Sequence, residues 1–337
     1  MSLALLIMIF CILGVIFVNG WTDAPNAIAT VVGTRSLSPR AAVLMAAICN
    51  LLGAAAVWIM GAKVAFTIQS IADFGQGKSA GAALAAALLS IILWAVLAWR
   101  FGIPTSESHA LAAGLTGAAL AVSGAQAVNP AALGKVAAGL FVSAGMGFLL
   151  GMFATRLLER VCRPLPRRGT GIFFKAGQIA AGAMTAFFHG AQDGQKFMGV
   201  CVLGLLLARG ESPVAPVAAP AGVVLVCALV MGLGTSAGGG RIIKAVGMEM
   251  TPLQRSQGFA ADLAASLCLL LSTLWGLPVS TTHTKTAAVM GAGAARRMRA
   301  VNWRIAGEMA AAWIITFPAC GILGYFLSKL FLLLFGR

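Results

Sequence analysis

The stretch that decides the fold is Pro104-Thr-Ser-Glu-Ser-His109, because it returns as Pro278-Val-Ser-Thr-Thr-His283 in the second half of the chain. A second polar stretch is repeated in the same way, since Asp23-x-x-Asn26 returns as Asp193-x-x-Lys196. Asp193 follows Asp23 by 170 residues and His283 follows His109 by 174, so both halves carry the two motifs in the same order. Duplicated halves with interrupted apolar segments are typical of secondary transporters, which bind their substrate near the bilayer midplane between the repeats.

The composition indicates a membrane protein. Of the 337 residues, 60% are hydrophobic and only 10% are charged, and the mean hydropathy is +0.94, whereas about a quarter of the residues in soluble proteins are charged. Residues 1–18 lack a basic n-region and a cleavage-site pattern, so we interpret them as a first membrane helix and not as a signal peptide. Apolar runs that approach or exceed the roughly 20 residues needed to cross a bilayer lie near 3–18, 41–61, 81–99, 131–154, 214–234 and 305–334.

The net charge of +15 indicates membrane topology and not nucleic-acid binding, because the basic residues lie in short loops between apolar runs and form no amphipathic or aromatic-interleaved face. If these loops are cytoplasmic, both termini face outward and each half crosses the membrane an odd number of times. The second half is then inverted relative to the first. We therefore predict a multi-pass protein of the inner or plasma membrane. The basic loop residues are Arg35 and Arg40; Arg156, Arg160, Arg163, Arg167 and Arg168; Arg241, Lys244 and Arg255; and Arg296, Arg297, Arg299 and Arg304.

A compact Pro-, Gly- and Arg-rich stretch divides the chain into two repeats. We predict an all-α polytopic fold with a first inverted repeat over 1–162, a basic cytoplasmic linker over 163–171 and a second inverted repeat over 172–337. In each half we expect a first helix broken at the Asp motif, a second span, two helices around the Pro-Ser-His motif and a final span. The two helices, about 81–101 with 105–122 and 257–275 with 281–295, form either a re-entrant hairpin or two full spans, and the charges do not decide between them.

Asp23 and Asp193 are candidate cation ligands. An acid at membrane depth costs about 2.5–3.5 kcal/mol on insertion scales, so it needs a cation, a donor cluster or water beside it. Residues that interrupt helices and supply oxygen atoms surround both acids, and carboxylate, amide and backbone oxygens form a ligand set for a hard cation. The alternative is an ordinary solvated aspartate in a surface loop, which would have to occur twice at matched positions. The neighbouring residues are Asn19, Gly20, Pro25 and Asn26 in the first half and Gly190, Gln192 and Gly194 in the second.

The two Pro-Ser-His motifs are candidate anion sites. Thr105 and Ser106 follow Pro104, and Ser280 follows Pro278 by two residues, so each motif predicts an N-cap and a first helical turn with free N–H groups. Such helix ends, directed at the midplane from two inverted repeats, would enclose a tetrahedral oxyanion. The alternative is a simple helix cap at the membrane interface.

All three histidines lie in these motifs. His109 and His283 are repeat mates on the first turn after the cap, and His189 precedes Asp193 by four residues. Each imidazole can donate to the backbone or to an anion, or it can serve only a helix–helix hydrogen bond. The seven cysteines show no CxxC or His-paired spacing, so we expect neither a disulfide nor a resident metal or cofactor.

The four motifs resemble the paired signatures of the inorganic phosphate transporter (PiT) family of cation-coupled symporters. The family patterns Gly-Ala-Asn-Asp-x-x-Asn and Pro-x-Ser-Thr-Thr-His match both halves and hence nearly the whole chain. The resemblance implies inverted repeats, often a homodimer, with sodium or protons as the coupling cation. It implies that the cation is held by Asp23, Asn26 and Asp193, and phosphate by Thr105, Ser106, Ser108, Ser280, Thr281 and Thr282.

Three departures from internal symmetry bear on the mechanism. Lys196 stands where the first half has Asn26, and an ammonium cannot coordinate a metal ion. It is either a tethered cation that replaces one of two mobile ions or a lysine that snorkels from a helix end to the surface. When the two halves are aligned, Glu107 corresponds to Thr281 and Thr22 corresponds to Gln192. A symmetric two-cation site is therefore not expected. Asp262 and Glu308 are flanked by apolar residues and are expected to be buried partners or cavity residues.

The function that these features favour is import of inorganic phosphate by cation symport through alternating access. Sulfate is the alternative within the same fold, and an ionised Glu107 would favour monohydrogen phosphate, which owns a proton to donate. An ion channel is a less favoured alternative. An intramembrane hydrolase is disfavoured because Ser106 and His109 have no evident orienting acid, so we do not expect an enzyme.

Overall fold

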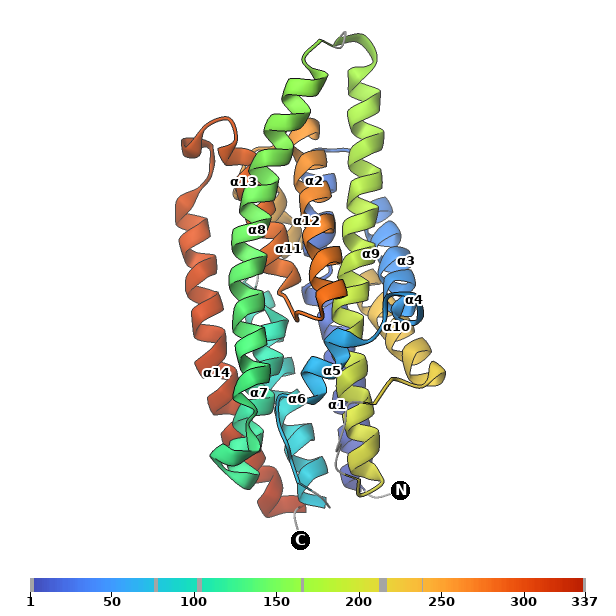
Figure 1. The fold of residues 1–337 in the computed structure, drawn as a ribbon, viewed down its shortest axis with the longest axis vertical. Helices are drawn as coiled ribbons and strands as arrows, with labels where there is room; N and C mark the ends of the chain where they lie inside the picture. Colours follow the sequence, from blue (N-terminus) through green and yellow to red (C-terminus); the bar gives the residue numbers. More distant parts are fainter. Residues whose placement is uncertain are drawn as a thin grey trace.

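The computed structural model describes residues 3–75, 78–101, 105–164, 167–211, 217–237 and 239–335, which form a bundle of helices (Figure 1). The helices of the first half are α1 (Leu3–Thr22), α2 (Pro25–Gly33), α3 (Pro39–Ala55), α4 (Val57–Met60), α5 (Lys63–Gln69), α6 (Lys78–Phe101), α7 (Glu107–Ser123), η1 (Ala125–Ala127) and α8 (Pro130–Cys162). Those of the second are α9 (Arg167–Ala208), α10 (Ala221–Ser236), α11 (Gly240–Lys244), η2 (Ala245–Glu249), α12 (Arg255–Trp275), α13 (Thr281–Ala294), η3 (Met298–Ala300) and α14 (Trp303–Phe335).

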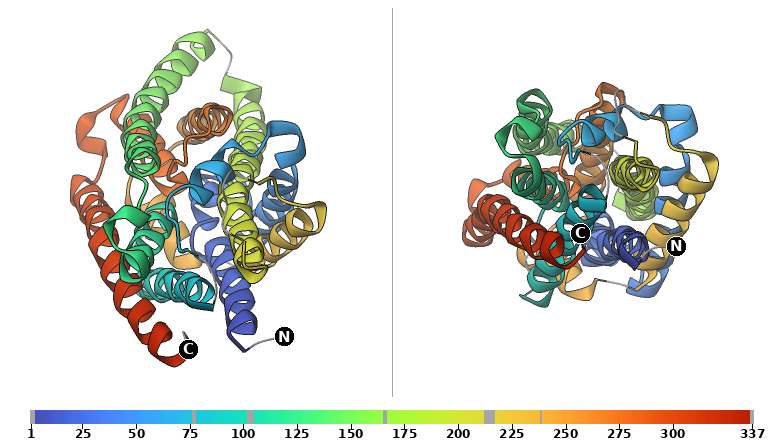
Figure 2. Two further views of the ribbon diagram at one scale, coloured as in Figure 1. Left: turned by 60° about the horizontal axis from the view of Figure 1, so that its bottom comes forward. Right: turned by 90° about the horizontal axis from the view of Figure 1, so that it is seen from below.

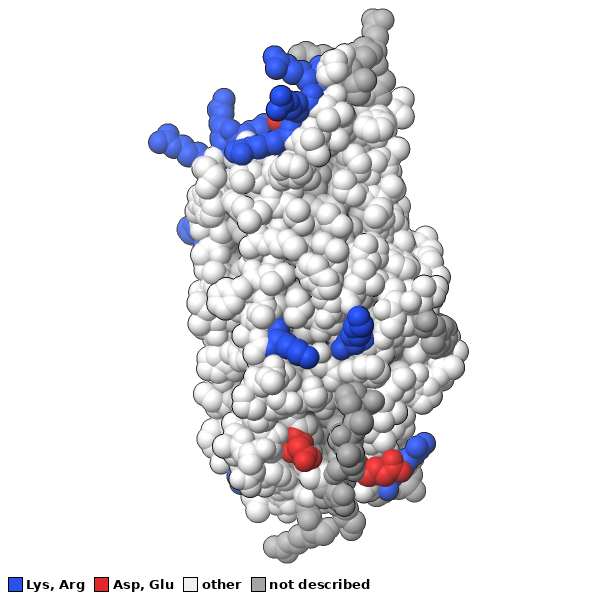
Figure 3. Space-filling model, in the orientation of Figure 1, with Lys and Arg blue, Asp and Glu red and all other residues white. Residues whose placement is uncertain are grey.

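The polarity of the bundle is that of a protein in lipid. Six helical segments of the described chain are long and apolar enough to cross a bilayer. Large apolar side chains such as Phe10, Phe141 and Ile314 point outward, whereas Asp23 and Asp193 are buried. Figure 3 shows few charged side chains over the middle of the molecule and a dense group of Lys and Arg at its upper end. An apolar surface around a polar interior matches the rule that ionisable residues in membrane segments face the inside of the bundle.

The expected break at the Asp motif is confirmed in the first half and wrong in the second. In the first half α1 ends at Thr22 and α2 begins at Pro25. Proline lacks the N–H that would continue the helix, so the helical hydrogen bonding is interrupted at Asp23 and Ala24, although the two helices together still form one candidate membrane span, Leu5–Gly33. In the second half α9 runs without interruption through Gly190 and Gly194. Glycine lowers helix propensity but keeps its N–H, so without a proline the helix continues.

The helices around the two Pro-Ser-His motifs form hairpins whose ends lie together. Beyond the ends of α6 and α7, the backbone N–H of Asp73 donates to the carbonyl oxygen of Ala127 at 2.8 Å. At the open end of α12 and α13, Arg296 Nη1 donates to Gln254 Oε1 at 3.1 Å. The 14 residues of α13 span only about 21 Å, less than the roughly 30 Å of a hydrocarbon core. Figure 1 shows the α6–α7 hairpin in the lower part of the molecule and the α12–α13 hairpin in the upper part. The opposed hairpins favour the re-entrant alternative, but α6 and α12, with 24 and 21 residues, are each long enough to cross a bilayer, so the choice between hairpins and full spans stays a prediction.

Each hairpin packs mainly on the other half of the chain, with α7 against α14 and α13 against α8. Glycine permits both contacts. A Cβ at Gly117 would lie 2.0 Å from the carbonyl oxygen of Gly321, and a Cβ at Gly291, its repeat mate, would lie 2.0 Å from that of Phe148. Close backbone approach at small residues is how helices associate in lipid. Figure 2 shows α8 and α14 on one side of the bundle and α3 and α10 on the other.

The described chain begins and ends at the lower end of Figure 1, and the C-terminal end of α8 and the N-terminal end of α9 lie at the upper end, where the basic residues gather (Figures 1 and 3). Both ends of the described chain, at residues 3 and 335, therefore lie opposite the basic end. That this basic end is cytoplasmic stays a prediction, as do the repeat boundaries. Leu165 and Pro166 of the predicted linker lie outside the described residues.

Candidate functional site

The repeated motifs of both halves meet in one buried centre. Asp23 lies in the turn between α1 and α2, and Asp193 lies on α9. The first turns of α7 and α13 reach the same place from opposite ends of the molecule (Figure 1). The hydroxyl of Thr281 lies 3.1 Å from Asp23 Oδ2 and 3.3 Å from Asp193 Oδ2, so a single side chain joins the two acids.

Asp23 is held by neutral donors. Asn26 Nδ2 donates to Asp23 Oδ1 at 2.8 Å, and the Thr282 hydroxyl donates to the same oxygen. Asn26 Nδ2 also lies 3.2 Å from Thr282 Oγ1. These contacts connect the broken helix of the first half to the α13 N-terminus of the second half, and they bring no cationic side chain to Asp23.

Asp193 has an ammonium as its partner. Lys196 Nζ lies 2.5 Å from Asp193 Oδ1, while Asn19 Nδ2 donates to Asp193 Oδ2 at 3.1 Å. Lys196 also donates to Ser108 Oγ at 2.6 Å and to the carbonyl oxygen of Val279 at 2.7 Å. All three ammonium protons are therefore used, and Lys196 is only 1% exposed. The snorkelling interpretation of Lys196 is wrong, because its head group is directed inward to Asp193 and not outward to water.

The centre offers unpaired oxygen atoms to a cation. Asn19 Oδ1, Asn26 Oδ1 and Glu107 Oε2 are buried and have no hydrogen-bond donor among the described residues. Buried acceptors are nearly always paired in native structures, so unpaired ones need an explanation such as an ion or water. One ligand atom from each of Asp23, His189 and Asp193 also lies within 4.8 Å of the others. The donor set of carboxylate and amide oxygens therefore fits a hard cation.

Ser106 and Ser280 are the N-caps that the sequence predicts. Ser106 Oγ accepts from the backbone N–H of His109 at 3.3 Å, and Ser280 Oγ accepts from that of His283 at 3.2 Å. Among the described residues, none accepts a hydrogen bond from either hydroxyl. Thr105, next to Ser106, lines a cavity that Glu308 on α14 also lines, and its part in phosphate binding stays a prediction. Pro104 lies outside the described residues.

The two asymmetric positions have different surroundings. Glu107 is buried, and its Oε1 accepts a hydrogen bond from the Thr22 hydroxyl. Gln192 points away from Asp193, since its Nε2 donates to the carbonyl oxygen of Leu277 at 2.7 Å and its Oε1 accepts from Thr273 at 2.6 Å. Gln192 thus holds the turn between α12 and α13, whereas Glu107 belongs to the centre.

The histidines pack beside the centre. The rings of the repeat mates His109 and His283 lie 4.7 Å apart, and the ring of Trp313 lies 3.5 Å from that of His283. His189 Nδ1 lies 2.7 Å from Asn50 Oδ1, and its Nε2 lies 3.4 Å from Asp193 Oδ2. His189 Nε2 forms no hydrogen bond with the described residues, so His189 lies beside Asp193 without a bond to it, whereas His109 and His283 make a ring contact between α7 and α13.

Sequence reasoning missed several buried polar residues near the centre. Asp262 is buried as expected, but its cationic partner Lys285 was not foreseen. Glu308 has a largely exposed side chain and pairs with Arg304, so it is a cavity residue and not a buried one. The missed residues share one signal, a polar side chain inside an apolar helix; they are Thr30, Asn50, Gln178 and Lys285.

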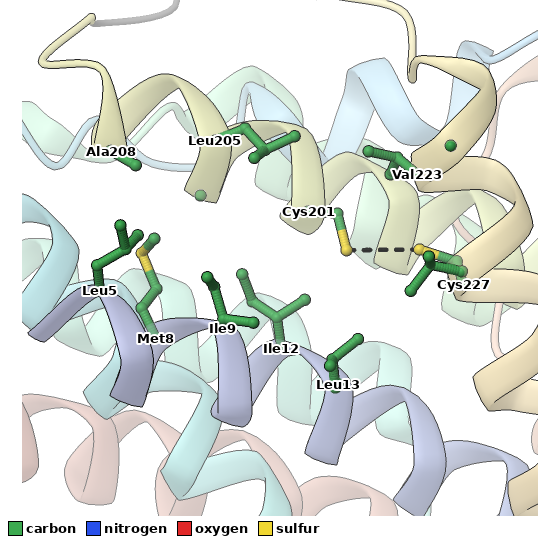
Figure 4. Close-up of a pocket in the computed structure, with 13 residues that line it drawn as sticks. Leu5, Met8, Ile9, Ile12, Leu13, Cys201, Leu205, Ala208, Val223 and Cys227 are labelled. Carbon is green, nitrogen blue, oxygen red and sulfur yellow. Dashed lines mark hydrogen bonds between the residues drawn. The ribbon is translucent and has the colours of Figure 1, made fainter. Parts of the chain in front are cut away.

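An apolar cavity lies apart from this centre, between α1, α9 and α10 (Figure 4). It measures about 270 Å³ and is lined by side chains such as Met8, Ile12 and Leu205. Cys201 and Cys227 lie at its edge with their sulfur atoms 3.4 Å apart. Without a polar group on its walls it does not suit an ion, so the polar centre is the candidate site.

Comparison with known proteins identifies the family pattern over both halves. The model described as "Phosphate transporter family" matches residues 19–168 and again residues 165–324. A protein named "Probable low-affinity inorganic phosphate transporter" from Bacillus subtilis (strain 168) is 35% identical over 95% of this chain and 94% of its own length. A protein of the same name from Rhizobium meliloti (strain 1021) is 37% identical over 93% of both chains.

The fold is also similar to a solved structure titled "The sodium-dependent phosphate transporter". The TM-score is 0.81 over 98% of this chain and 100% of that chain, at 22% sequence identity. The likeness confirms the all-α fold. The relatives are named as transporters, in agreement with the expectation that this chain is not an enzyme.

Proposed function

Because this chain belongs to the phosphate transporter family, we propose that it imports inorganic phosphate in symport with a cation, through alternating access of the centre. The observation that carries the proposal is the shared Thr281 hydroxyl, which joins an acid of each half within 3.3 Å. A centre built from both halves is the arrangement in which movement of one half against the other changes access to a fixed site.

The cation would lie between Asp23 and the unpaired oxygens. Asp23 Oδ2, Asn19 Oδ1 and Asn26 Oδ1 supply charge and neutral oxygens without a competing cationic side chain. Sodium and the proton both fit this description. The solved structure of similar fold is that of a sodium-dependent phosphate transporter, which favours sodium.

The charge of the centre implies an order of binding. Asp23, Glu107 and Asp193 are three buried carboxylates, and Lys196 supplies the one ammonium among them. When all are ionised, two negative charges remain in a poorly solvated site, where like charges repel strongly. A phosphate anion would therefore bind only after a cation has entered, which is the physical basis for symport.

Phosphate would bind at the N-termini of α7 and α13. Ser106 and Ser280 keep a hydroxyl proton to donate, and the first turn of each helix offers backbone N–H groups and the positive end of the dipole. The hydroxyls of Ser108, Thr281 and Thr282 contact charged groups of the centre and would position the anion beside the cation. Glu107 Oε2 lacks a donor. It would accept a hydrogen bond from the hydroxyl group of monohydrogen phosphate, a donor that sulfate lacks, so sulfate is not favoured.

Lys196 would act as the second, tethered cation. Its three contacts are a carboxylate, a hydroxyl and a backbone carbonyl, a ligand set that would otherwise suit a metal ion. Its repeat mate Asn26 has no such charge. A single mobile cation at the Asp23 side would then drive each cycle.

The arrangement in the membrane belongs to the same proposal. The basic end would face the cytoplasm, since short cytoplasmic loops carry an excess of Lys and Arg, and both termini would face outward. The two halves, 1–162 and 172–337, would be inverted repeats joined by the 163–171 linker. A homodimer, as the resemblance implies, would be the assembly.

The test is uptake of radiolabelled phosphate and sulfate into proteoliposomes under sodium and proton gradients that are imposed separately. We expect phosphate to accumulate above equilibrium under one of the two gradients, and sulfate to accumulate far less. Asp23→Asn is the matched control, since it keeps the shape of the side chain and removes its charge. Flux that follows the phosphate gradient alone, with no accumulation under either cation, would identify a channel and overturn the proposal.

A further inference from the structure

A second buried cluster lies beside the centre and has no part in the proposed binding of either substrate. Asp262 and Lys285 form an ion pair inside the α12–α13 hairpin, with side chains 0% and 1% exposed. Thr30 on α2 donates to both carboxylate oxygens, at 2.7 and 2.9 Å, and Gln178 on α9 donates to Asp262 Oδ2 at 3.0 Å. Lys285 Nζ reaches α2 as well, at 3.0 Å from Thr30 Oγ1 and 3.1 Å from the carbonyl oxygen of Ala27.

The other half of the chain has an apolar set at the equivalent positions. With the shift of 174 residues that relates the hairpins, Asp262 corresponds to Leu88 and Lys285 to Leu111. With the shift of 170 that relates the Asp motifs, Thr30 corresponds to Val200 and Gln178 to Met8. All four mates are buried in a single apolar core cluster. At these four positions the first half packs with apolar side chains alone, so the charges at the matching positions of the other hairpin are not needed for packing.

The cluster lies between the centre and the basic end of the molecule. Lys285 follows Thr282 by one helical turn, about 4.5 Å along α13, and Arg296 lies about 16 Å beyond it. On α2, Thr30 follows Asn26 by one turn and Arg35 follows the end of the helix. The hairpin and α2 also meet at the basic end, where Arg255 Nη2 lies 3.5 Å from the carbonyl oxygen of Arg35. Any route from the centre to the basic end between α2 and α13 passes this cluster.

We propose that Thr30, Gln178, Asp262 and Lys285 form the latch of the inner gate, which closes the centre toward the basic end and opens when α2 separates from the α12–α13 hairpin. The inference rests on the proposed transport function and adds the element that controls release of phosphate and cation.

The composition of the latch suits a contact that must open. Asp262 and Lys285 are both on the hairpin, so their ion pair stays intact when the hairpin leaves α2. Only the contacts of the pair to Thr30 and Ala27 on α2 break, while Gln178 on α9 keeps its hydrogen bond to Asp262. A buried ion pair carries a large desolvation cost, and opening would return the pair to water. Because this gain offsets the lost hydrogen bonds, the closed and open states stay close in free energy, whereas an apolar seal would favour the closed state.

The test exchanges the latch for the apolar set of the other half, by Thr30→Val, Gln178→Met, Asp262→Leu and Lys285→Leu together. This variant leaves no buried polar group of the latch without a partner. We expect phosphate binding to the purified protein to stay within about twofold of wild type, and uptake into proteoliposomes to fall about tenfold or more, because the gate remains closed. A matched control neutralises the exposed pair Lys244 and Glu249 by Lys244→Gln and Glu249→Gln, and should transport normally.

Thr30→Val alone is expected to have the opposite effect, because it should favour the open gate. This test does not require the fourfold variant to fold. It removes the hydroxyl that ties α2 to the pair but keeps the pair on its hairpin. Nitroxide labels are attached at Arg40→Cys and Arg299→Cys, two exposed positions at the basic end, in a cysteine-free version of the protein with normal uptake. The distance between the two labels reports the separation of α2 from the α12–α13 hairpin. We expect Thr30→Val to raise the fraction of molecules in which the two labels are far apart, and the fourfold variant to lower this fraction.

Two outcomes would overturn the latch. One is wild-type uptake by the fourfold variant, and the other is a label separation that Thr30→Val leaves unchanged. Failure of the proposed function is distinguishable, because the wild-type protein itself would then neither bind phosphate nor accumulate it.

Discussion

Replacing Lys196 by asparagine exchanges the tethered ammonium for an amide, the group that its repeat mate Asn26 carries. Asp193 Oδ1 then loses its partner at 2.5 Å, while Ser108 Oγ and the carbonyl oxygen of Val279 lose theirs at 2.6 and 2.7 Å. The variant keeps the Asp193 carboxylate and the other oxygen atoms of a second cation site, without a resident cation in it. We expect a second mobile cation to bind there.

The size of the effect follows from the buried ion pair. Removing one partner of such a pair costs about 3–5 kcal/mol, so without cation Lys196→Asn should be less stable by about that amount. A cation at a concentration of about 100 times its dissociation constant would stabilise the folded variant by about 2.7 kcal/mol. In transport, a tenfold cation gradient supplies about 1.4 kcal/mol per ion, so the limiting phosphate accumulation should rise from about tenfold to about a hundredfold.

The assay measures phosphate accumulation in proteoliposomes against the imposed cation gradient, with the membrane potential held at zero. Thermal unfolding of the purified variant at increasing cation concentration gives the second readout. Lys196→Met is the matched control, since it removes the charge without adding an oxygen ligand and should gain no cation dependence. If Lys196→Asn transports with the gradient dependence of wild type, the tethered-cation reasoning is refuted.

Four further changes test other parts of the centre. Asp23→Asn should abolish accumulation in a protein that still inserts, because the mobile cation loses its charged ligand; concentrative uptake by this variant would contradict the assignment. Ser106→Ala combined with Ser280→Ala should weaken phosphate binding by about 1.5–3 kcal/mol for each lost hydrogen bond to the anion, and unchanged affinity would place the anion elsewhere. Glu107→Gln should reduce the preference for phosphate over sulfate in competition assays; an unaltered preference would exclude Glu107 from selectivity. Gly190→Ala should lower the unfolding temperature, since its Cβ would lie 2.2 Å from a backbone oxygen of α3 and overpacking costs about 1–3 kcal/mol; a wild-type melting curve would argue against this close contact.

The duplicated motifs predicted the convergence of the site well, because repeat mates must occupy equivalent places in a duplicated fold. The break at Asp23 followed from Pro25, a residue whose effect on a helix is local. The break expected near Asp193 failed because Gly190 and Gly194 alter only propensity, and the packing of α9 overrides it.

Other features could not be predicted because they depend on the distance between helices. Lys196 had two interpretations, since its sequence position does not say which face of α9 is buried. Asp262 was recognised as a buried acid, but its partner Lys285 lies on another helix and could be found only by comparing each half with the other. The sequence also left open whether each pair of helices forms a re-entrant hairpin or two full spans. Both arrangements place the flanking basic loops on the same side of the membrane, so the loop charges do not distinguish them.

The central claim is that a cation and phosphate bind the same centre and depend on each other. Equilibrium binding of radiolabelled phosphate to the purified protein, with sodium concentration and pH varied separately, tests it most directly. The account predicts that one of the two cations raises the phosphate affinity and that phosphate raises the affinity of this cation by the same factor, as linkage requires. A phosphate affinity that stays constant across both titrations would contradict it.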